Sequence, residues 1–419
     1  MRSSLDRHSF VLWPSASCLN VLAVISLSLP FIVCAQEELK DLVGNGAVVL
    51  HSPVGEAIVS LNADTPLIPA SLLKIPLAQA ALSALGEDYR FETQFYRNEC
   101  GDLLVRGLGD PFLVSEDIAV IAKRLSQQGL QRIQRLVMDD SAFEPELDLP
   151  REAGVDDPYA ARNSALAVNF NTVSLAWNAE QQIISGEQET PLTEVARLLG
   201  KTLAPGQPRR VNMGANPELG LAQVQQLFAY FLNDAGVVLA DKTFYREVLT
   251  DEWTLIYRYR SSRPLRDIVA GMLRYSNNFI ANQLFLALGA HSSGYPVTSE
   301  AAQEALERKL AELYGSGFGR NPDKLFMTEG SGLARYQRTT ASGFVRVLDK
   351  FVPYANLLPA FDGALRKSGT LTGVFNYAGF FTAAEGLYPF VIITNQAENN
   401  RDELLNELER LVSNFGAVP

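Results

Sequence analysis

The chain has 419 residues, of which 47% are hydrophobic and 20% are charged, and its formal net charge is −11 at pH 7. That length suffices for two domains, or for one large domain with an insertion. The acidic balance argues against nucleic acid and anionic lipid as partners. With three histidines in the chain, a zinc site built from histidine ligands is not expected. We therefore expect no metal and no other cofactor.

The first 35 residues have the pattern of an export signal. Arg2 and Arg7 precede the apolar run 21–35, and Val33-Cys34-Ala35 resembles a signal-peptidase site. The run of about 15 residues is short for a membrane span of ~20. We expect 1–35 to be a cleaved signal peptide that directs the protein to the periplasm, with no stable membrane anchor. A retained anchor is the alternative.

A serine and a lysine three residues apart stand at the start of the first predicted helix. Before them, the segments 47–51 and 57–61 alternate like a β-hairpin. The helix begins at Ser71 and ends near Gly86. Ser71 and Lys74 share one face, because residues i and i+3 are neighbours on a helix. A neutral lysine there could take the serine proton and make the hydroxyl a nucleophile.

After this helix the sequence changes character and predicts an inserted mixed α/β domain over 89–251. The flanking parts, 36–88 and 252–419, would form the catalytic domain, and a strand at 253–260 would lead back into it. Cys100, the one cysteine left after signal cleavage, is expected to pack as a small residue. The insert is expected to contain strands at 91–96, 103–108, 132–138 and 168–177, and helices at 116–128, 192–203, 218–233 and 242–249.

Two further polar motifs follow in the second half of the chain. Ser276-Asn277-Asn278 lies within 267–288, which is predicted to be a buried helix or helix pair. Polar side chains in such an apolar run are costly unless they face a cleft or have bonding partners. Lys367-Ser368-Gly369-Thr370 is followed by two predicted strands, at 374–382 and 387–394.

Each motif alone has an ordinary structural explanation. Ser71 could be a helix cap, Lys74 a solvated charge, and the Ser276 motif a satisfied buried polar cluster. However, Ser-x-x-Lys, Ser-x-Asn and Lys-Ser/Thr-Gly in that order form the signature of the penicillin-recognising serine enzymes. Because independent coincidences multiply, the three motifs in order outweigh the separate explanations.

The chain resembles the class C low-molecular-mass penicillin-binding proteins of the penicillin-binding protein 4 type, which are D-alanyl-D-alanine carboxypeptidases and endopeptidases. The resemblance runs from about residue 45 to the C-terminus. Further shared landmarks are Gly101-Asp102-Leu103, Gly109-Asp110-Pro111, Asp140-Ser141-Ala142-Phe143, the stretch 164–171 (SALAVNFN), Gly330-Ser331-Gly332-Leu333 and Tyr377-Ala378-Gly379.

This resemblance implies a multi-domain α+β protein with the penicilloyl-serine transferase (DD-peptidase) fold. An antiparallel sheet would be flanked by helices, with the mixed α/β domain inserted after the first catalytic helix. The chain departs from the family in three places. Ser368 stands where threonine is usual, Asn277 replaces a frequent aspartate, and the stretch 171–253 is too short for the additional third domain of some members.

The resemblance also implies roles for the motif residues. Ser71 would attack the penultimate D-alanine carbonyl, with Lys74 as its base. Lys367 would lower the pKa of Lys74 as a second positive charge. Ser276 would relay the proton to the leaving amine, and Asn278 would bond the base and the substrate amide.

Substrate binding would involve residues around this centre. Lys367 and Ser368 would hold the terminal carboxylate, and the N–H groups of Ser71 and Thr370 would form the oxyanion hole. The expected substrate-contacting residues are Ser368, Gly369, Thr370, Arg335 and Asp139, with Asp140 as the alternative to Asp139.

We interpret the sequence as a serine-type D-Ala-D-Ala carboxypeptidase, DD-endopeptidase or both, acting on peptidoglycan stem peptides and inhibited covalently by β-lactams. One alternative is a serine β-lactamase. Another is a catalytically idle wall-binding protein, although such a protein has no need of intact Ser71, Lys74 and Lys367 together.

Overall fold

The computed structural model describes residues 37–147, 149–150, 156–214 and 216–415. The expected signal peptide at 1–35 lies outside the described residues.

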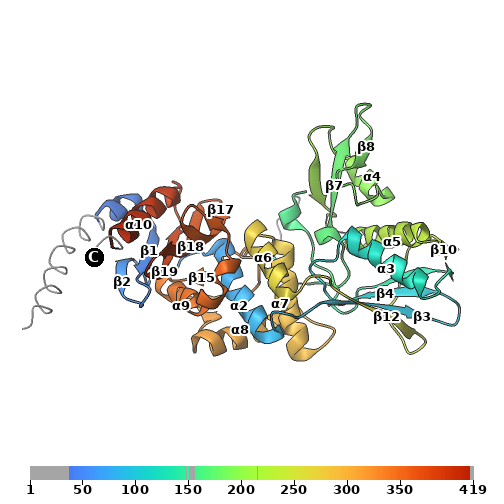
Figure 1. Ribbon diagram of the computed structural model, residues 1–419, viewed down its shortest axis with the longest axis horizontal. Helices are drawn as coiled ribbons and strands as arrows, with labels where there is room; N and C mark the ends of the chain where they lie inside the picture. Colours follow the sequence, from blue (N-terminus) through green and yellow to red (C-terminus); the bar gives the residue numbers. More distant parts are fainter. Residues whose placement is uncertain (1–36, 148, 151–155, 215, 416–419) are drawn as a thin grey trace, which may run out of the picture.

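A six-stranded antiparallel sheet organises the half of the molecule that carries the motifs. The first hairpin supplies two of its strands and the C-terminal part supplies four (Figure 1). In spatial order the strands are β16 (Ala360–Phe361), β17 (Ala364–Leu371), β18 (Val374–Ala383), β19 (Gly386–Thr394), β1 (Gly46–His51) and β2 (Ala57–Leu61). Every neighbouring pair is antiparallel, which confirms the expected sheet.

Different helices cover the two faces of this sheet, because successive residues of a strand point to opposite sides. On β1, Ala47 and Val49 pack with the helices of one side, whereas Val48 and Leu50 pack with helix α10. The helices are α2 (Lys74–Leu85), α6 (Leu265–Tyr275), α7 (Asn278–Ser293), α8 (Ser299–Tyr314) and α9 (Ala341–Phe351) on the first side and α10 (Arg401–Phe415) on the second. The expected α+β architecture is confirmed.

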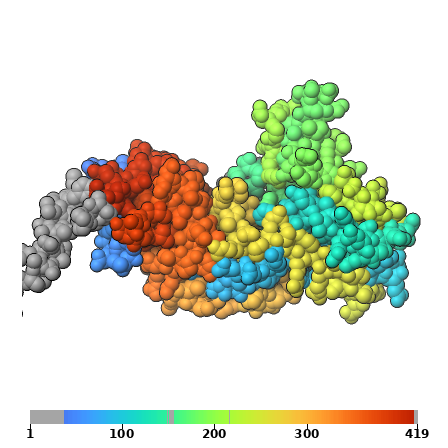
Figure 2. Space-filling model, in the orientation of Figure 1, coloured from blue at the N-terminus to red at the C-terminus, as the bar shows by residue number. Residues whose placement is uncertain are grey.

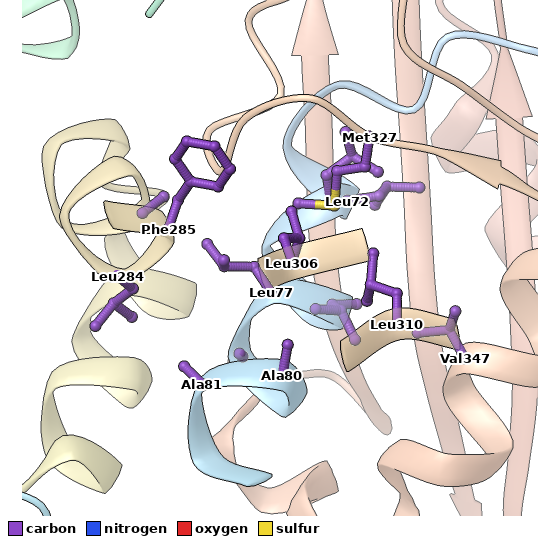
Figure 3. Packing of buried hydrophobic residues seen from close by; sticks show 14 of the residues in the cluster. Leu72, Leu77, Ala80, Ala81, Leu284, Phe285, Leu306, Leu310, Met327 and Val347 are labelled. Carbon is purple, nitrogen blue, oxygen red and sulfur yellow. The ribbon is translucent and has the colours of Figure 1, made fainter. Parts of the chain in front are cut away.

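Helix α2 lies inside the first core. From Lys74 to Leu82 every residue is buried. Figure 3 shows Leu77 of α2 packed near Phe285 of α7 and Leu306 of α8. A helix that is apolar on all sides has to be covered on all sides. Its single charged residue, Lys74, is therefore removed from water together with its apolar neighbours.

The intervening part of the chain forms a second, mixed sheet. In spatial order its strands are β11 (Tyr245–Arg246), β6 (Leu136–Asp139), β4 (Leu103–Gly107), β3 (Glu92–Arg97) and β12 (Thr254–Arg260). The pairs β12·β3 and β3·β4 are antiparallel, whereas β4·β6 and β6·β11 are parallel. Helices α3 (Ser115–Gln127) and α5 (Pro217–Asp234) pack on the sheet through a separate core.

Two details of this region differ from expectation. The predicted helix at 242–249 is wrong, because Tyr245 pairs with Val137 of β6 and its ring packs under the Arg135 guanidinium at 4.9 Å. Strand β12 pairs with β3 rather than with the six-stranded sheet. The sequence places these residues in the catalytic part that starts at 252; we propose instead that the inserted domain runs from residue 89 through Arg260.

A small lobe projects from this region (Figures 1 and 2). The stretch 171–253 was expected to be too short for a third domain, yet part of it forms a three-stranded sheet and one helix with their own hydrophobic core. The elements are β8 (Ile183–Ser185), β7 (Thr172–Trp177), β9 (Arg209–Asn212) and α4 (Glu194–Gly200). The sheet starts four residues later than the predicted strand at 168–177, because Asn169, Phe170 and Asn171 have positive φ angles.

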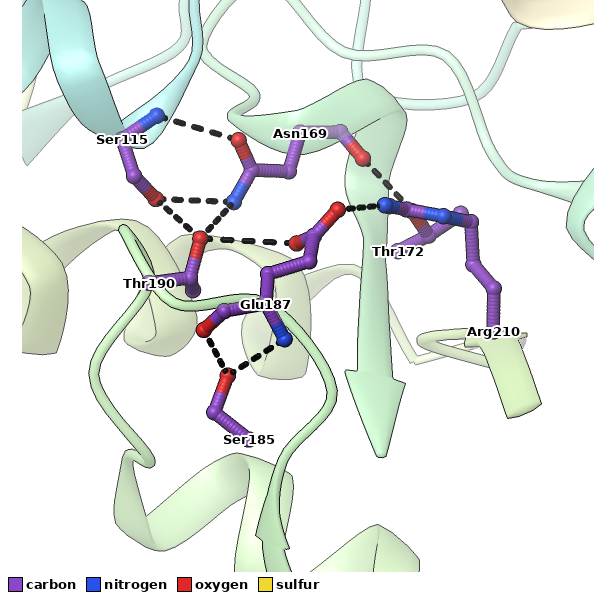
Figure 4. Close-up of polar contacts among 7 residues, drawn as sticks. All are labelled: Ser115, Asn169, Thr172, Ser185, Glu187, Thr190 and Arg210. Atoms are coloured by element: carbon purple, nitrogen blue, oxygen red, sulfur yellow. Dashed lines mark hydrogen bonds and ion pairs between the residues drawn. The ribbon is translucent and has the colours of Figure 1, made fainter. Parts of the chain in front are cut away.

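Polar contacts join this lobe to helix α3, as Figure 4 shows. Asn169 accepts a hydrogen bond from the Ser115 backbone at 3.0 Å and donates one to the Ser115 hydroxyl at 2.9 Å. Thr190 of the lobe also donates to that hydroxyl at 2.9 Å, and Glu187 forms an ion pair with Arg210.

Shorter elements complete the described chain. They are β5 (Arg132–Ile133) paired with β10 (Val238–Leu239), the sheet of β13 (Arg320–Asn321), β14 (Leu325–Phe326) and β15 (Arg338–Thr339), and the 3₁₀ turns Ala70–Leu73, Pro158–Ala160, Asn169–Asn171 and Val352–Leu357. Cys100 is exposed, so the expectation that it is packed is wrong; it lies in the turn between β3 and β4.

Candidate active site

Ser71 lies in a 3₁₀ turn, Ala70–Leu73, directly before α2. The residue before it, Ala70, has a φ of 50°, a conformation that persists only where the surroundings enforce it. A Cβ at Gly332 would lie 2.1 Å from the Ala70 carbonyl oxygen, and a Cβ at Gly369 would lie 2.7 Å from the Pro69 carbonyl oxygen. The absence of a side chain at these two glycines thus allows the neighbouring backbone to pack closely against the turn that contains Ser71.

Lys74 is completely buried beside this serine. Its Nζ lies 2.9 Å from Ser71 Oγ, 2.8 Å from Asn278 Oδ1 and 2.5 Å from the Ser331 carbonyl oxygen. Burial, followed by the positive charge of Lys367, holds the pKa of Lys74 well below its usual value. Both causes favour the neutral amine, which is the form that can accept a proton.

The hydrogen-bond inventory around Lys74 also suits a neutral amine. Such an amine has two N–H bonds and one lone pair. The Ser331 carbonyl can only accept, and the Asn278 amide presents its oxygen to Lys74 because its nitrogen donates to the Tyr159 carbonyl at 3.2 Å. These two acceptors occupy both hydrogens. In the structure Lys74 also donates to Ser71 Oγ at 2.9 Å, and Ser71 Oγ donates to the Ser331 carbonyl at 3.3 Å. In the neutral amine the lone pair can instead face the Ser71 hydroxyl and accept its proton.

Ser276 occupies the break between α6 and α7, so the predicted segment 267–288 is a helix pair. Its φ of 52° ends α6 in a left-handed conformation. Asn277 caps α7 by accepting a hydrogen bond from the Ile280 backbone at 2.9 Å. Asparagine and aspartate are equally good helix N-caps, so the departure at this position keeps the capping function. Ser276 Oγ lies 2.8 Å from the Nζ of Lys367.

Lys367 is the second buried lysine of the cluster. Besides Ser276, it donates to the Ser368 carbonyl at 2.7 Å. Burial, followed by the positive charge of Arg401, lowers the pKa of Lys367 to about 7. The five residues expected to be catalytic thus form two groups, Lys74 with Ser71 and Asn278, and Lys367 with Ser276, and the charge of Lys367 acts on Lys74.

Beside them, the outer edge of β17 carries the other expected contacts. Strand β16 pairs only with Ala364 and Leu365. Among the described strands, none pairs with the outer edge of β17 beyond that point. Ser368, Gly369 and Thr370 lie there, with Thr370 exposed. An open strand edge of this kind can bind an extended peptide through main-chain hydrogen bonds.

Comparisons with known proteins identify the family of the chain. Residues 33–207 and 221–414 match the D-Ala-D-Ala carboxypeptidase 3 (S13) family. The chain belongs to that family. It is 28% identical over 423 residues to a D-alanyl-D-alanine carboxypeptidase of Actinomadura sp. (strain R39), covering 84% of this chain and 77% of the relative. It is 23% identical over 404 residues to the D-alanyl-D-alanine carboxypeptidase DacB of Haemophilus influenzae, covering 81% and 83%.

Solved structures share the S13 fold of this chain. Penicillin binding protein 4 from Haemophilus influenzae matches with a TM-score of 0.70 and 20% identity, covering 91% of this chain and 99% of the other. A predatory peptidoglycan endopeptidase from Bdellovibrio bacteriovorus matches with a TM-score of 0.53 and 14% identity, covering 89% and 93%. The expected penicillin-binding protein 4 type and its DD-peptidase fold are confirmed.

The two charged residues expected to contact substrate have different positions in this S13 protein. Arg335 is exposed and donates to the Thr372 carbonyl, just past β17, at 3.0 Å. Asp139 is 1% exposed and accepts hydrogen bonds from the backbone of Ser141 at 2.8 Å and of Leu249 at 3.1 Å. The Asp139 carboxylate thus has partners inside the protein. Its alternative, Asp140, forms an ion pair with Arg246 at 2.8 Å, and Arg335 stays the expected substrate contact.

Sequence reasoning missed the function of the loop that contains Ser331. Glu329, 1% exposed, accepts hydrogen bonds from the Ser331 backbone at 2.6 Å, the Gly332 backbone at 2.8 Å and the Gln337 side chain at 2.7 Å. These bonds orient the Ser331 carbonyl towards Lys74. The Gly-Ser-Gly landmark marks this loop in the sequence, but a carbonyl contact leaves no residue-type signal.

Metal ligands do not gather in the described parts of the chain. No group of three or more histidine, cysteine, aspartate or glutamate side chains there is arranged to hold an ion.

Proposed function

We propose that this S13 family member is a serine-type D-Ala-D-Ala carboxypeptidase and DD-endopeptidase that cleaves peptidoglycan stem peptides through an acyl-enzyme on Ser71. The observation that carries the proposal is the position of Lys74 Nζ, 2.9 Å from Ser71 Oγ, in a fully buried site. The activities of its relatives, a D-alanyl-D-alanine carboxypeptidase and a peptidoglycan endopeptidase, support the same substrate class.

Acylation begins when Ser71 Oγ attacks the carbonyl carbon of the penultimate D-alanine and its proton moves to Lys74. The C–N bond then breaks. The leaving nitrogen receives a proton from the Ser276 hydroxyl, which is replenished by the proton held on Lys74. In deacylation, Lys74 takes a proton from water, the resulting hydroxide attacks the acyl carbon, and the proton returns to Ser71.

Other groups bind and stabilise the reacting amide. The backbone N–H groups of Ser71 and Thr370 would stabilise the developing oxyanion. The protonated Lys367 keeps Lys74 neutral and, with Ser368, attracts the carboxylate of the leaving residue. The open edge of β17 would align the peptide.

We further propose that the protein acts in the periplasm after removal of residues 1–35. Among the described helices, none is both long and apolar enough to cross a membrane. The family's substrate class, peptidoglycan, is extracytoplasmic, which supports export. β-Lactams are the expected covalent inhibitors; a structural relative from Haemophilus influenzae was solved with a novel β-lactam.

Incubation with purified muropeptides, followed by mass spectrometry, tests the proposal. Loss of terminal D-alanine would show carboxypeptidase activity, and conversion of cross-linked dimers to monomers would show endopeptidase activity. If neither product forms, and the enzyme hydrolyses a chromogenic cephalosporin at many turnovers per second, the result would instead favour the β-lactamase alternative.

A further inference from the structure

A cavity of about 220 Å³ opens beside Lys367. Its lining includes Ser276, Lys367 and Ser368 from the proposed catalytic centre, and Arg366, Tyr377 and Arg401 from beyond it. Ser276 is the group that protonates the leaving nitrogen in the proposed mechanism. The cavity therefore lies on the leaving-group side of the scissile bond.

Two arginines pack against one aromatic ring of this cavity. The guanidinium carbons of Arg366 and Arg401 lie 4.7 and 4.6 Å from the centre of the Tyr377 ring. Arg366 also lies 4.8 Å from the centre of the Phe361 ring. Burial, followed by the nearby Asp402 carboxylate, raises the pKa of Tyr377. Contact with the ring restricts the two guanidinium groups, while an arginine on an aromatic ring can still donate hydrogen bonds to other partners.

The N–H groups of these arginines are incompletely used. Arg401 donates one hydrogen bond, to Thr370 Oγ1 at 2.7 Å. The Nε atoms of Arg366 and Arg401 are buried without a hydrogen-bond partner. Within the described residues neither arginine forms an ion pair with a carboxylate, although ion pairs are found elsewhere in the protein. Buried donors on charged groups are costly when unpaired, so this pair is suited to receive an anion.

We propose that Arg401 and Arg366 recognise the carboxylate of the amino acid that leaves the enzyme, next to the nitrogen released from the scissile amide. This inference rests on the proposed function. Arginine is suited to such a site because its planar fork matches the geometry of a carboxylate. The hydroxyl of Thr370, which accepts from Arg401, keeps its own hydrogen for the same ligand.

The site selects among substrates by their chemistry. A terminal D-alanine carries a carboxylate on the carbon bonded to the leaving nitrogen. In a cross-linked peptide the leaving nitrogen belongs to a diamino acid, and only diaminopimelate, not lysine, has a carboxylate on the adjacent carbon. The endopeptidase activity should therefore prefer diaminopimelate cross-links.

Binding measurements in a Ser71→Ala background test the site without requiring catalysis. Calorimetry would compare an acetylated L-Lys-D-Ala-D-Ala tripeptide with the same peptide carrying a C-terminal amide. We expect the acid to bind roughly tenfold more tightly, the value of about one charge-assisted hydrogen bond. Adding Arg401→Gln or Arg366→Gln should reduce that preference to about threefold or less.

The matched control is Arg346→Gln, because Arg346 also stacks on a ring, that of Phe318, at 5.8 Å. It should keep the full preference. Equal binding of acid and amide by the Ser71→Ala parent would overturn the proposal, even if the arginine variants failed to fold. So would an unchanged preference in both folded arginine variants.

Failure of the proposed function gives a different result. A wild-type enzyme that neither releases D-alanine nor is acylated by penicillin, while its Ser71→Ala variant binds the acid through the two arginines, would refute the peptidase and retain the anion site. Normal D-alanine release without any arginine-dependent preference for the acid would support the peptidase and refute the anion site.

Discussion

Lys74 and its three neighbours form the residue-scale unit on which the proposed chemistry depends. The Nζ contacts two obligate acceptors and the Ser71 hydroxyl, and burial disfavours its charged form. These geometric and electrostatic features both support the proposed role of Lys74 as the base. The second buried lysine, Lys367, donates a hydrogen bond to Ser276, the proposed proton relay. The two lysines thus have different expected protonation states.

The first prediction concerns the nucleophile and its base. Ser71→Ala should abolish covalent labelling by a fluorescent penicillin, and Lys74→Ala should slow acylation by ~10²–10⁴-fold, the usual contribution of positioned proton transfer. Gel fluorescence and stopped-flow labelling measure the two effects. Persistent labelling of the Ser71→Ala protein would mean that another residue is the nucleophile.

The second prediction concerns pH. Lys74 must be neutral, so kcat/KM should rise with pH through its lowered pKa. Lys367 must be charged, so kcat/KM should fall as pH rises through a pKa of about 7. The profile should be bell-shaped. Because the positive charge of Arg401 lowers the pKa of Lys367, Arg401→Gln should move the alkaline limb to higher pH. An alkaline limb at the same pH in the Arg401→Gln variant would contradict the assignment of this limb to Lys367.

The third prediction concerns Glu329. Its negative charge raises the pKa of Lys74, so Glu329→Gln should shift the acid limb of acylation to lower pH. The plateau rate should fall roughly tenfold, because a glutamine amide cannot accept all the hydrogen bonds of the loop. Glu56→Gln, at an exposed turn, is the control and should change neither quantity. A lower plateau with an unshifted limb would indicate a purely structural role.

At the scale of elements, the packing of α2 and of the turn before it determines where the site residues lie. The helix is buried on all sides, and its position fixes Lys74, while the 3₁₀ turn holds Ser71 between the Gly332 loop and β17. Interiors packed at crystal-like density tolerate little movement. The core around α2 therefore determines the distance between nucleophile and base.

The fourth prediction tests this packing. Leu77 is fully buried, so Leu77→Ala should destabilise the protein by about 2–5 kcal/mol through lost burial and a residual cavity. The matched control is Val120→Ala on α3, where the side chain is 60% exposed; we expect a change within about 0.5 kcal/mol. Denaturant titration followed by penicillin labelling reports on the catalytic half. Equal effects for both variants would contradict the packing argument.

At the scale of the whole molecule, two sheets with separate cores divide the chain, and a small lobe is joined to helix α3 by the contacts of Figure 4. The motif residues come from both sides of the insertion, since Ser71 precedes it and Ser276 follows it. The inserted domain also reaches the site, because the Tyr159 carbonyl accepts from Asn278. Its boundaries from residue 89 through Arg260 remain our proposal.

The fifth prediction concerns the exported form. If residues 1–35 are a cleaved signal, the protein isolated from the periplasm should begin near Gln36 and contain one titratable thiol, that of the exposed Cys100. Intact-mass measurement with and without a thiol reagent checks both points. A retained N-terminus or a lipid adduct would refute cleavage at this position.

Sequence alone determined the order of the three motifs, the antiparallel sheet and a helix that carries Lys74, although the α-helix begins at Lys74 and Ser71 lies in the 3₁₀ turn before it. Local periodicity and residue type encode these features directly. It failed at 242–249, where pairing with β6 overrides the local helical pattern. It predicted the strand at 253–260 but assigned it to the catalytic part, whereas the strand pairs with β3, since strand partners depend on contacts distant in the chain.

Only the tertiary structure decided which neighbours surround the motif residues. The Ser331 carbonyl, the Glu329 carboxylate, the Tyr159 carbonyl and the arginine pair on Tyr377 come from segments far from Ser71 in sequence. Asp139 proved to be buried, although its motif suggested a substrate contact. Backbone acceptors and burial have no residue-type signature, because they arise when distant segments pack together.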